Sequence, residues 1–142
     1  ASLTNVGNVT ISLNNALTNV DGLANLTETR GTLRIRANDA LPTVDGLASL
    51  RNVGGILDID DNDALINIDG LTNLTSVGGI LTITNNDALT NVDGLASLTE
   101  LGANLRIHDN TSLCQSLVDA FVAMLRALGW PDTTETYGNA DC

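Results

Sequence analysis

A unit of 24 residues repeats along most of the chain, and this period restricts the possible folds more than any other feature. The sequence LTNVDGL at 17–23 recurs in similar form at 41–47, 65–71 and 89–95. The other half of each unit carries Leu-x-Ile-x-x-Asn, at 33–38, 57–62, 81–86 and 105–110, and a Val-x-Ile-x-x-Asn variant stands at 9–14. Units this short cannot bury an apolar face alone, so the period predicts coils that stack on one another.

The alternation in Leu-x-Ile-x predicts a strand with one buried face, and Gly54-Gly55 predicts a tight bend before it. At Asp21-Gly22 and its repeats, we expect glycine to supply a positive φ and aspartate to cap its own backbone. A helix across 17–26 is poorly supported, because Asn, Thr, Val and Gly dominate this segment. The predicted unit is strand, turn, short extended stretch and turn, stacked into parallel sheets.

One asparagine follows every strand motif, at Asn14, Asn38, Asn62, Asn86 and Asn110. When coils stack, each amide can bond the backbone of its own turn and that of the next coil. Such bonds satisfy polar groups that the stacking buries. We therefore interpret this column as structural, in preference to a ligand-binding row of amides.

Composition agrees with a thin repetitive core and excludes some partners. Aromatic residues are 2% of the chain, and Phe121, Trp130 and Tyr137 all lie in its last quarter, so the repeats must build their core from aliphatic side chains. The net charge of −11 disfavours nucleic acid and anionic lipid as partners. No apolar run approaches the roughly 18–20 residues that span a bilayer, so we expect no membrane insertion.

The repeat pattern ends at Ser112, and residues 113–142 are predicted to form a helical cap. Ser112 and Gln115 fit a capping box. Gly129 and Pro131 are typical of a helix end, and Trp130 is expected to cover the last coil. Apolar residues follow the capping box at helical spacing, at Leu113, Leu117, Val118, Phe121, Val122, Leu125 and Leu128.

The chain contains two cysteines, Cys114 and Cys142, both in the cap. We interpret them as one disulfide formed in an oxidising compartment, which predicts a secreted or cell-surface protein. Two free thiols or a metal pair are the alternatives. No histidine or further cysteine lies nearby in the sequence to complete a zinc site.

The motif Leu-x-Ile-x-x-Asn-x-x-Leu, as at 57–65, resembles the leucine-rich-repeat superfamily, and more closely the receptor L-domain variant of growth-factor-receptor ectodomains. The ordinary leucine-rich repeat has Asn-x-Leu after its strand and a helical convex segment, which this chain lacks. The resemblance covers about residues 3–113. It implies a mainly β, right-handed parallel β-solenoid of about five coils, in which repeats 1–112 and cap 113–142 form one domain. It implies no particular ligand, and uniform repeats of this kind also occur in secreted bacterial proteins, the expected source.

Residues that point out of the Leu-x-Ile-x sheet vary, whereas the scaffold is nearly constant. They are Thr10, Ser12, Arg34, Arg36, Asp58, Asp60, Thr82, Thr84, Arg106 and His108. Variation on a fixed scaffold predicts a surface that recognises a protein or glycan. The alternative is a solvated face, where Arg34–Asp58 and Arg36–Asp60 are cross-strand ion pairs that only set register.

Catalysis, cofactors and metals have little support. His108 is the only histidine, and no nucleophile elbow, phosphate loop or dinucleotide motif occurs. The segment 58–63 resembles a calcium loop, but Asp63 replaces the required glycine and Asp69 the bidentate glutamate. We therefore expect no enzyme activity, no cofactor and no metal site.

Three functions remain open. The first is an extracellular recognition or adhesion module. The second is a structural spacer, a monomeric fragment of a larger surface protein, which the start of the sequence within a repeat favours. The third is an ice-binding surface, from the small residues after Asp-Gly (Ala24, Ala48, Thr72 and Ala96) and from Thr82-Ile-Thr84. Arginine and aspartate at the matching places of other coils count against it.

Overall fold

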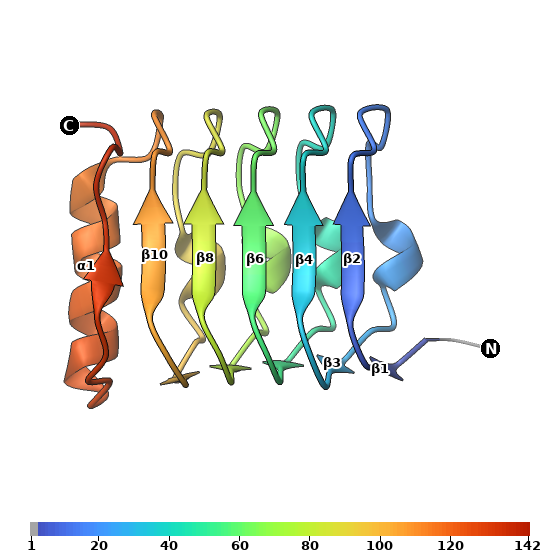
Figure 1. The fold of residues 1–142 in the computed structure, drawn as a ribbon, viewed down its shortest axis with the longest axis horizontal. Helices are drawn as coiled ribbons and strands as arrows, with labels where there is room; N and C mark the ends of the chain where they lie inside the picture. Colours follow the sequence, from blue (N-terminus) through green and yellow to red (C-terminus); the bar gives the residue numbers. More distant parts are fainter. Residues whose placement is uncertain (1–2) are drawn as a thin grey trace.

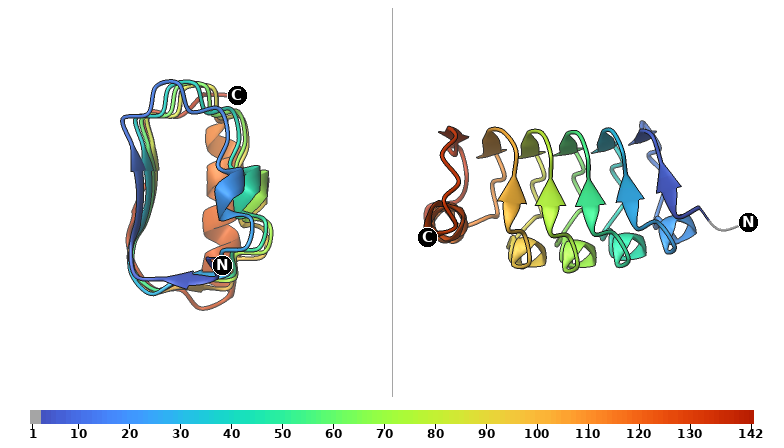
Figure 2. Two further views of the ribbon diagram at one scale, coloured as in Figure 1. Left: turned by 90° about the vertical axis from the view of Figure 1, so that its right-hand side faces the viewer. Right: turned by 90° about the horizontal axis from the view of Figure 1, so that it is seen from below.

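Successive coils stack along a common axis (Figure 1), and the chain winds around an oblong cross-section (Figure 2, left). The computed structural model describes residues 3–142. Two parallel sheets run along the stack, and a helix covers its C-terminal end. The predicted fold class, a mainly β parallel solenoid with a helical cap, is confirmed. None of the helices described is long and apolar enough to cross a membrane.

The six-stranded sheet, called the main sheet, has the order β11-β10-β8-β6-β4-β2. Its strands are β2 (Val9–Ser12), β4 (Leu33–Arg36), β6 (Leu57–Asp60), β8 (Leu81–Thr84), β10 (Leu105–His108) and β11 (Thr134–Glu135). Leu33 pairs with Leu57, and Ile35 with Ile59. This in-register pairing places equivalent side chains in rows, where the inward leucines and isoleucines of β4, β6, β8 and β10 are fully buried. Each such side chain contributes about 1.5–3 kcal/mol by leaving water.

The five-stranded sheet, called the minor sheet, forms one short side of the oblong coil (Figure 2) and has the order β1-β3-β5-β7-β9. Its strands are β1 (Asn5–Val6), β3 (Glu28–Thr29), β5 (Asn52–Val53), β7 (Ser76–Val77) and β9 (Glu100–Leu101). The wall opposite the main sheet carries one short helical turn per coil (Figure 2). These 3₁₀ helices are η1 (Asp21–Leu23), η2 (Asp45–Leu47), η3 (Asp69–Leu71) and η4 (Asp93–Leu95). The Asp-Gly segments, predicted as turns, are thus single turns of 3₁₀ helix, and each is followed by a short extended strand of the minor sheet.

The Asp-Gly turn also differs from its predicted chemistry. The glycines with positive φ among residues 3–142 are Gly129 and Gly138, so Gly70 and its equivalents do not supply one. Instead, a Cβ on Gly70 would lie 2.0 Å from the carbonyl oxygen of Val44 in the preceding coil. The N–H of Asp69 donates to Asn67 Oδ1 at 3.0 Å, so the turn is fixed by an asparagine side chain rather than by the aspartate. Glycine is needed here because adjacent coils touch through their backbones.

The residue after each of the main-sheet strands β2, β4, β6, β8 and β10 adopts the left-handed conformation, which turns the chain out of the sheet. These residues have φ between 52° and 59° and are Leu13, Ala37, Asp61, Asn85 and Asp109. The next residue in every coil is the repeated asparagine. Because L-residues pay an energetic penalty in this region, the stacked coils must impose the conformation.

The asparagine column bonds as predicted. Asn62 Nδ2 donates to the carbonyl oxygens of Ile35 and Asp60, both at 3.0 Å. Its Oδ1 accepts the backbone N–H of Asn38 at 3.2 Å. Asn38, Asn62, Asn86 and Asn110 are fully buried. The column therefore satisfies its own polar groups and those of the adjoining turns.

The cap helix α1 (Gln115–Ala127) begins after Cys114, and no side chain caps it, so the predicted capping box at Ser112 was wrong. The backbone of the C-terminal segment takes that role. The Gln115 N–H donates to the Ala140 carbonyl at 2.8 Å, and the Ala140 N–H donates to the Leu113 carbonyl at 2.7 Å. The predicted disulfide between Cys114 and Cys142 is present and fastens the same segment.

The apolar face of α1 packs on the last coil through Val118, Phe121 and Leu125. Trp130 is buried, and its Nε1–H donates to the Ala103 carbonyl at 3.0 Å, so it covers the last coil as predicted. Leu117 and Leu128, which the helical pattern placed in the same apolar set, are exposed.

The cap also contains an unpredicted partial coil. Strand β11 pairs with β10 in parallel, with Thr134 opposite Leu105 and Glu135 opposite Arg106. Asn139 then extends the asparagine column, because its Oδ1 accepts the Asn110 N–H at 3.2 Å. The spacing from Thr134 to Asn139 equals that from Leu105 to Asn110. This equal spacing is the feature of the sequence from which the partial coil could have been predicted.

Candidate recognition surface

All ten predicted site residues lie on the outward face of the main sheet, in two columns set by strand register. One column is Thr10, Arg34, Asp58, Thr82 and Arg106, and the other is Ser12, Arg36, Asp60, Thr84 and His108. The main-sheet strands lie side by side in one plane, so the columns share one broad face (Figure 1). The sequence therefore predicts which residues form this face and in which order they follow one another along each column.

Arginine and aspartate pair across β4 and β6, as the sequence predicts. Arg34 Nε lies 2.8 Å from Asp58 Oδ2, and Arg36 Nε lies 3.0 Å from Asp60 Oδ2. The arginine side chains are 44% and 57% exposed, whereas those of the aspartates are 15% and 16% exposed. Arg34 donates its Nε–H to Asp58, and both guanidinium groups keep further donors toward solvent. Although the chain has a net charge of −11, the exposed charged groups at this place are the cationic guanidinium groups.

Asp60 also accepts hydrogen bonds from two polar side chains of the next coil. Thr84 Oγ1 donates to Asp60 Oδ1 at 2.7 Å, and Asn85 Nδ2 donates to the same oxygen at 3.0 Å. Thr84 is only 5% exposed. Of the ten predicted residues, Thr84 is therefore the one held within the surface rather than presented by it.

A shallow pocket of about 380 Å³ opens on this face at the first two coils. Four of its lining residues are predicted site residues, namely Thr10, Ser12, Arg34 and Arg36. Sequence reasoning missed the others, Leu13, Ala37 and Asp61. Each directly follows a main-sheet strand, and this position was the signal that could have found them.

The cap extends the face beyond β10. Arg106 Nε lies 3.3 Å from Glu135 Oε1. The His108 ring stacks on Tyr137, with centroids 4.6 Å apart, and His108 Nδ1 lies 2.7 Å from Asp109 Oδ2. Tyr137 is 56% exposed, so this end presents an aromatic ring beside charged groups. Glu135 and Tyr137 were not predicted, because β11 was not.

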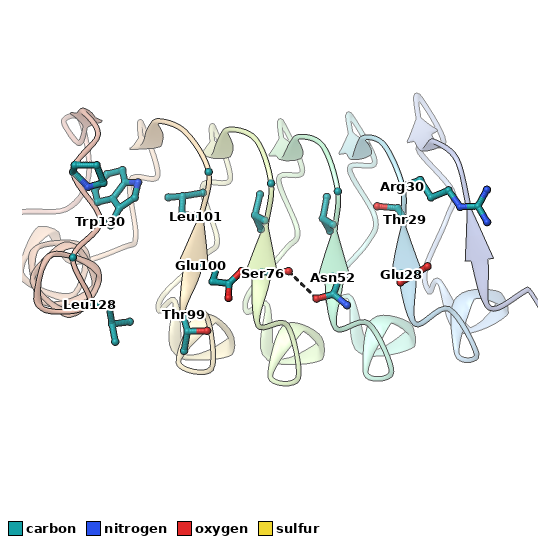
Figure 3. Close-up of a pocket in the computed structure, with 17 residues that line it drawn as sticks. Glu28, Thr29, Arg30, Asn52, Ser76, Thr99, Glu100, Leu101, Leu128 and Trp130 are labelled. Atoms are coloured by element: carbon teal, nitrogen blue, oxygen red, sulfur yellow. Dashed lines mark hydrogen bonds between the residues drawn. The ribbon is translucent and has the colours of Figure 1, made fainter.

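A second depression runs along the outside of the minor sheet (Figure 3). It measures about 690 Å³ and ends at a wall that includes Leu128 and Trp130. Its polar side chains include Ser76, whose Oγ donates to Asn52 Oδ1 at 2.7 Å. The guanidinium of Arg126 covers one face of the Trp130 ring, 4.4 Å from its centroid, and Trp130 is only 7% exposed. The chemistry of this groove selects no ligand class.

Of the residues considered for ice binding, Thr82 and Thr84 lie in β8 of the main sheet, whereas the small residues after Asp-Gly lie outside both sheets. Ala24, Ala48, Thr72 and Ala96 each follow a separate 3₁₀ turn as its C-cap. These turns form the uneven wall of the solenoid (Figure 2).

Within residues 3–142, His, Cys, Asp and Glu form no group of three or more that could hold a metal ion. Comparison with protein-family models and with curated protein sequences finds no match to this chain. The account of function therefore depends on the geometry of the surfaces.

Proposed function

We propose that this protein is an extracellular recognition or adhesion module, which binds a protein or glycan over the outward face of the main sheet. One observation carries the proposal. The half-exposed guanidinium groups of Arg34 and Arg36 line a pocket on a rigid face, above carboxylates that are largely covered. Guanidinium groups bind carboxylates in a two-pronged geometry, so we expect the ligand to present carboxylate or other acceptor oxygens.

Location and family are parts of the same proposal. The disulfide supports a secreted or cell-surface location, because such bonds persist in oxidising compartments. The repeated strand motif with its asparagine column supports a relationship to the leucine-rich-repeat superfamily, and the uniform repeats agree with the expected bacterial source.

A spacer without its own ligand is the second candidate. The ion pairs favour it, since each arginine already has a carboxylate partner in the neighbouring coil. In that case the pairs contribute only about 0.2–1 kcal/mol each to register and have no further role.

Exchanging one ion pair separates the two candidates. The whole chain is first screened against arrays of glycans and surface proteins. The strongest binder is then measured with a variant carrying Arg34→Asp and Asp58→Arg, which keeps this pair but moves its cation by one coil and leaves the Asp60 hydrogen bonds to Thr84 and Asn85 in place. Recognition predicts at least about a tenfold loss of affinity, with stability changed by less than about 1 kcal/mol.

Arg51→Asp is the matched control, because Arg51 is exposed and lies before β5 of the minor sheet. It changes charge without touching the main sheet and should leave binding unchanged. Equal binding by the exchanged variant would contradict recognition by this face, and a screen without any binder would favour the spacer.

A further inference from the structure

The outward face of the main sheet is electrically balanced, although the chain as a whole is strongly acidic. Between β4 and β11 this face carries three arginines and three carboxylates, namely Arg34, Arg36, Arg106, Asp58, Asp60 and Glu135. The net charge of −11 therefore lies on other surfaces. Two copies of the chain repel each other least where two such balanced faces meet.

The same face is flat. Viewed along the stack, the strands from β2 to β10 nearly superimpose (Figure 2, left), so this sheet has little of the usual twist of roughly 20–25° per strand. A strongly twisted sheet would touch a second one over only part of its width. A flat face can contact another flat face across several strands.

The charges along this face follow an order that becomes its own complement when it is reversed. One column runs from β4 to β11 as Arg34, Asp58, Thr82, Arg106 and Glu135. Consider a second copy laid face to face on the first, about a two-fold axis that runs along β8. Arg34 then faces Glu135 of the other copy. Asp58 faces Arg106 of the other copy, and the two Thr82 side chains face each other.

The second column fits the same axis. It runs as Arg36, Asp60, Thr84, His108 and Tyr137, where Tyr137 stacks on His108. Arg36 faces Tyr137 of the other copy, whose phenol oxygen can accept a guanidinium N–H. The Arg36 side chain is 57% exposed and Tyr137 is 56% exposed, so both are accessible. Asp60 faces the imidazole of His108.

Other placements of two copies bring like charges together. An axis between β6 and β8 places Arg34 opposite Arg106. An axis between β8 and β10 places Asp58 opposite Glu135. A two-fold axis along the stack, instead of along the strands, places Arg34 opposite Arg36. Like charges across an interface disfavour each of these arrangements, so the pattern selects the axis along β8.

We propose that the chain forms a dimer in which the outward faces of two main sheets lie against each other, with Arg34 of each copy opposite Glu135 of the other. Asp58 of each copy then lies opposite Arg106 of the other. Each of these arginines has a carboxylate partner within its own chain, Asp58 at 2.8 Å from Arg34 and Glu135 at 3.3 Å from Arg106. The dimer gives each arginine a second carboxylate, using the guanidinium N–H donors that the first leaves open.

The size of this contact predicts a weak dimer. It spans five strands, about 24 Å, by about 13 Å along each strand. The area buried by both copies together is below about 1,200 Å², which is typical of weak complexes. We expect a dissociation constant of about 0.1–1 mM.

The dimer covers the proposed recognition surface, so a ligand of that face competes with the second copy. It does not rest on the proposed function, because it forms without ligand. It is therefore measured on the whole chain alone, by sedimentation from about 10 μM to about 1 mM. The buffer holds about 150 mM salt, which screens the net charge beyond about 8 Å.

Two exchanged variants test the register. The first carries Arg34→Asp with Asp58→Arg, and the second carries Arg106→Glu with Glu135→Arg. Each keeps its ion pair between neighbouring strands, so the fold should be retained. In a dimer of either variant alone, like charges face each other at every charged position of this column. Each should therefore dimerise at least about tenfold more weakly than the wild type.

An equimolar mixture of the two variants should dimerise as the wild type does, because opposite charges then face each other at all of these positions. One chain that carries all four substitutions should also dimerise as the wild type does, for the same reason. Arg51→Asp, outside the main sheet, is the control and should leave the dissociation constant unchanged. A wild type that stays monomeric up to about 1 mM would overturn the proposal. So would single variants that dimerise as tightly as the wild type, or a mixture that remains monomeric.

Discussion

Asn62 and Asn86 lie one coil apart and are joined by two hydrogen bonds. Asn86 Oδ1 accepts the backbone N–H of Asn62 at 3.1 Å and the Nδ2–H of Asn62, also at 3.1 Å. The same arrangement links Asn38 with Asn62 and Asn86 with Asn110. The spacing between coils is thus fixed by the continuous asparagine column as well as by the pairing of the strands.

Asn62→Ala should therefore destabilise the protein by about 3 kcal/mol or more. It leaves several buried donors and acceptors without a hydrogen-bond partner, and each of these costs about 1–3 kcal/mol. The matched control is Asn14→Ala at the open end. Asn14 is exposed, and its side chain donates to the Ser12 carbonyl. Its loss should cost less than about 1 kcal/mol. Urea unfolding of both variants measures the difference, and equal losses would contradict the role of the column.

Gly70→Ala and Gly22→Ala test whether coils touch through their backbones. A Cβ on Gly70 would collide with the Val44 carbonyl, whereas a Cβ on Gly22 would meet nothing within 4 Å, because no coil precedes it in the structure. We expect Gly70→Ala to cost about 1–3 kcal/mol or more and Gly22→Ala to change stability by less than about 1 kcal/mol. Thermal unfolding compares them, and similar effects at the two glycines would refute the close approach.

Ala37→Gly should stabilise the protein by about 0.5–1 kcal/mol, because Ala37 has a φ of 52° and glycine relieves the left-handed penalty. Ala48→Gly serves as its counterpart. Ala48 has a φ of −60°, so glycine there should destabilise by about 0.5–1 kcal/mol through backbone entropy. Opposite signs are expected from denaturant midpoints, and a loss of stability in both variants would count against the strain.

Asp63 gives a prediction for pH. The side chain is exposed, but nearby protein atoms partly desolvate its carboxyl and raise the pKa above the ordinary value. The carboxylates of Asp39, Asp61 and Asp87 raise this pKa further by repulsion. The folded chain therefore holds this proton more tightly than the unfolded chain, so the charge on Asp63 lowers stability above the folded pKa. This penalty disappears as the pH falls below the unfolded pKa.

Asp63→Asn should accordingly stabilise the protein at neutral pH and low salt, by less than about 0.5 kcal/mol because the group is exposed. The part of the gain that comes from repulsion by Asp39, Asp61 and Asp87 should vanish in high salt, and the whole gain should vanish below the unfolded pKa of aspartate. A gain that survives both conditions would point to a cause other than charge repulsion.

The fold was predictable because each 24-residue unit places the same residue types at the same points of a coil. Leu33 and Ile35, for example, repeat at every coil with period-2 alternation, which defines a strand and its buried face. The ten residues of the main-sheet face followed directly, because register in a repeat is set by the period. Asn62 was assigned correctly because a buried amide at a strand end needs partners that only adjacent coils can provide.

The misses arise where contacts between distant residues override local pattern. Gly70 was expected to adopt a positive φ, but its role is to admit the Val44 carbonyl from another coil. Ser112 was expected to cap the helix, but the Ala140 carbonyl provides the bond. Strand β11 was missed because Thr134 replaces the leucine that marks the other strands, and with it Tyr137, an exposed part of the recognition face.

Backbone chemical-shift mapping of the isotopically labelled protein, titrated with the strongest binder from the glycan and protein arrays, tests the recognition face most directly. The account predicts shift changes concentrated on the outward residues of β4 and β6 and around the pocket that Arg34 and Arg36 line, with little change in the minor sheet. Changes confined to the minor-sheet groove beside Trp130, or to the 3₁₀ turns, would contradict it.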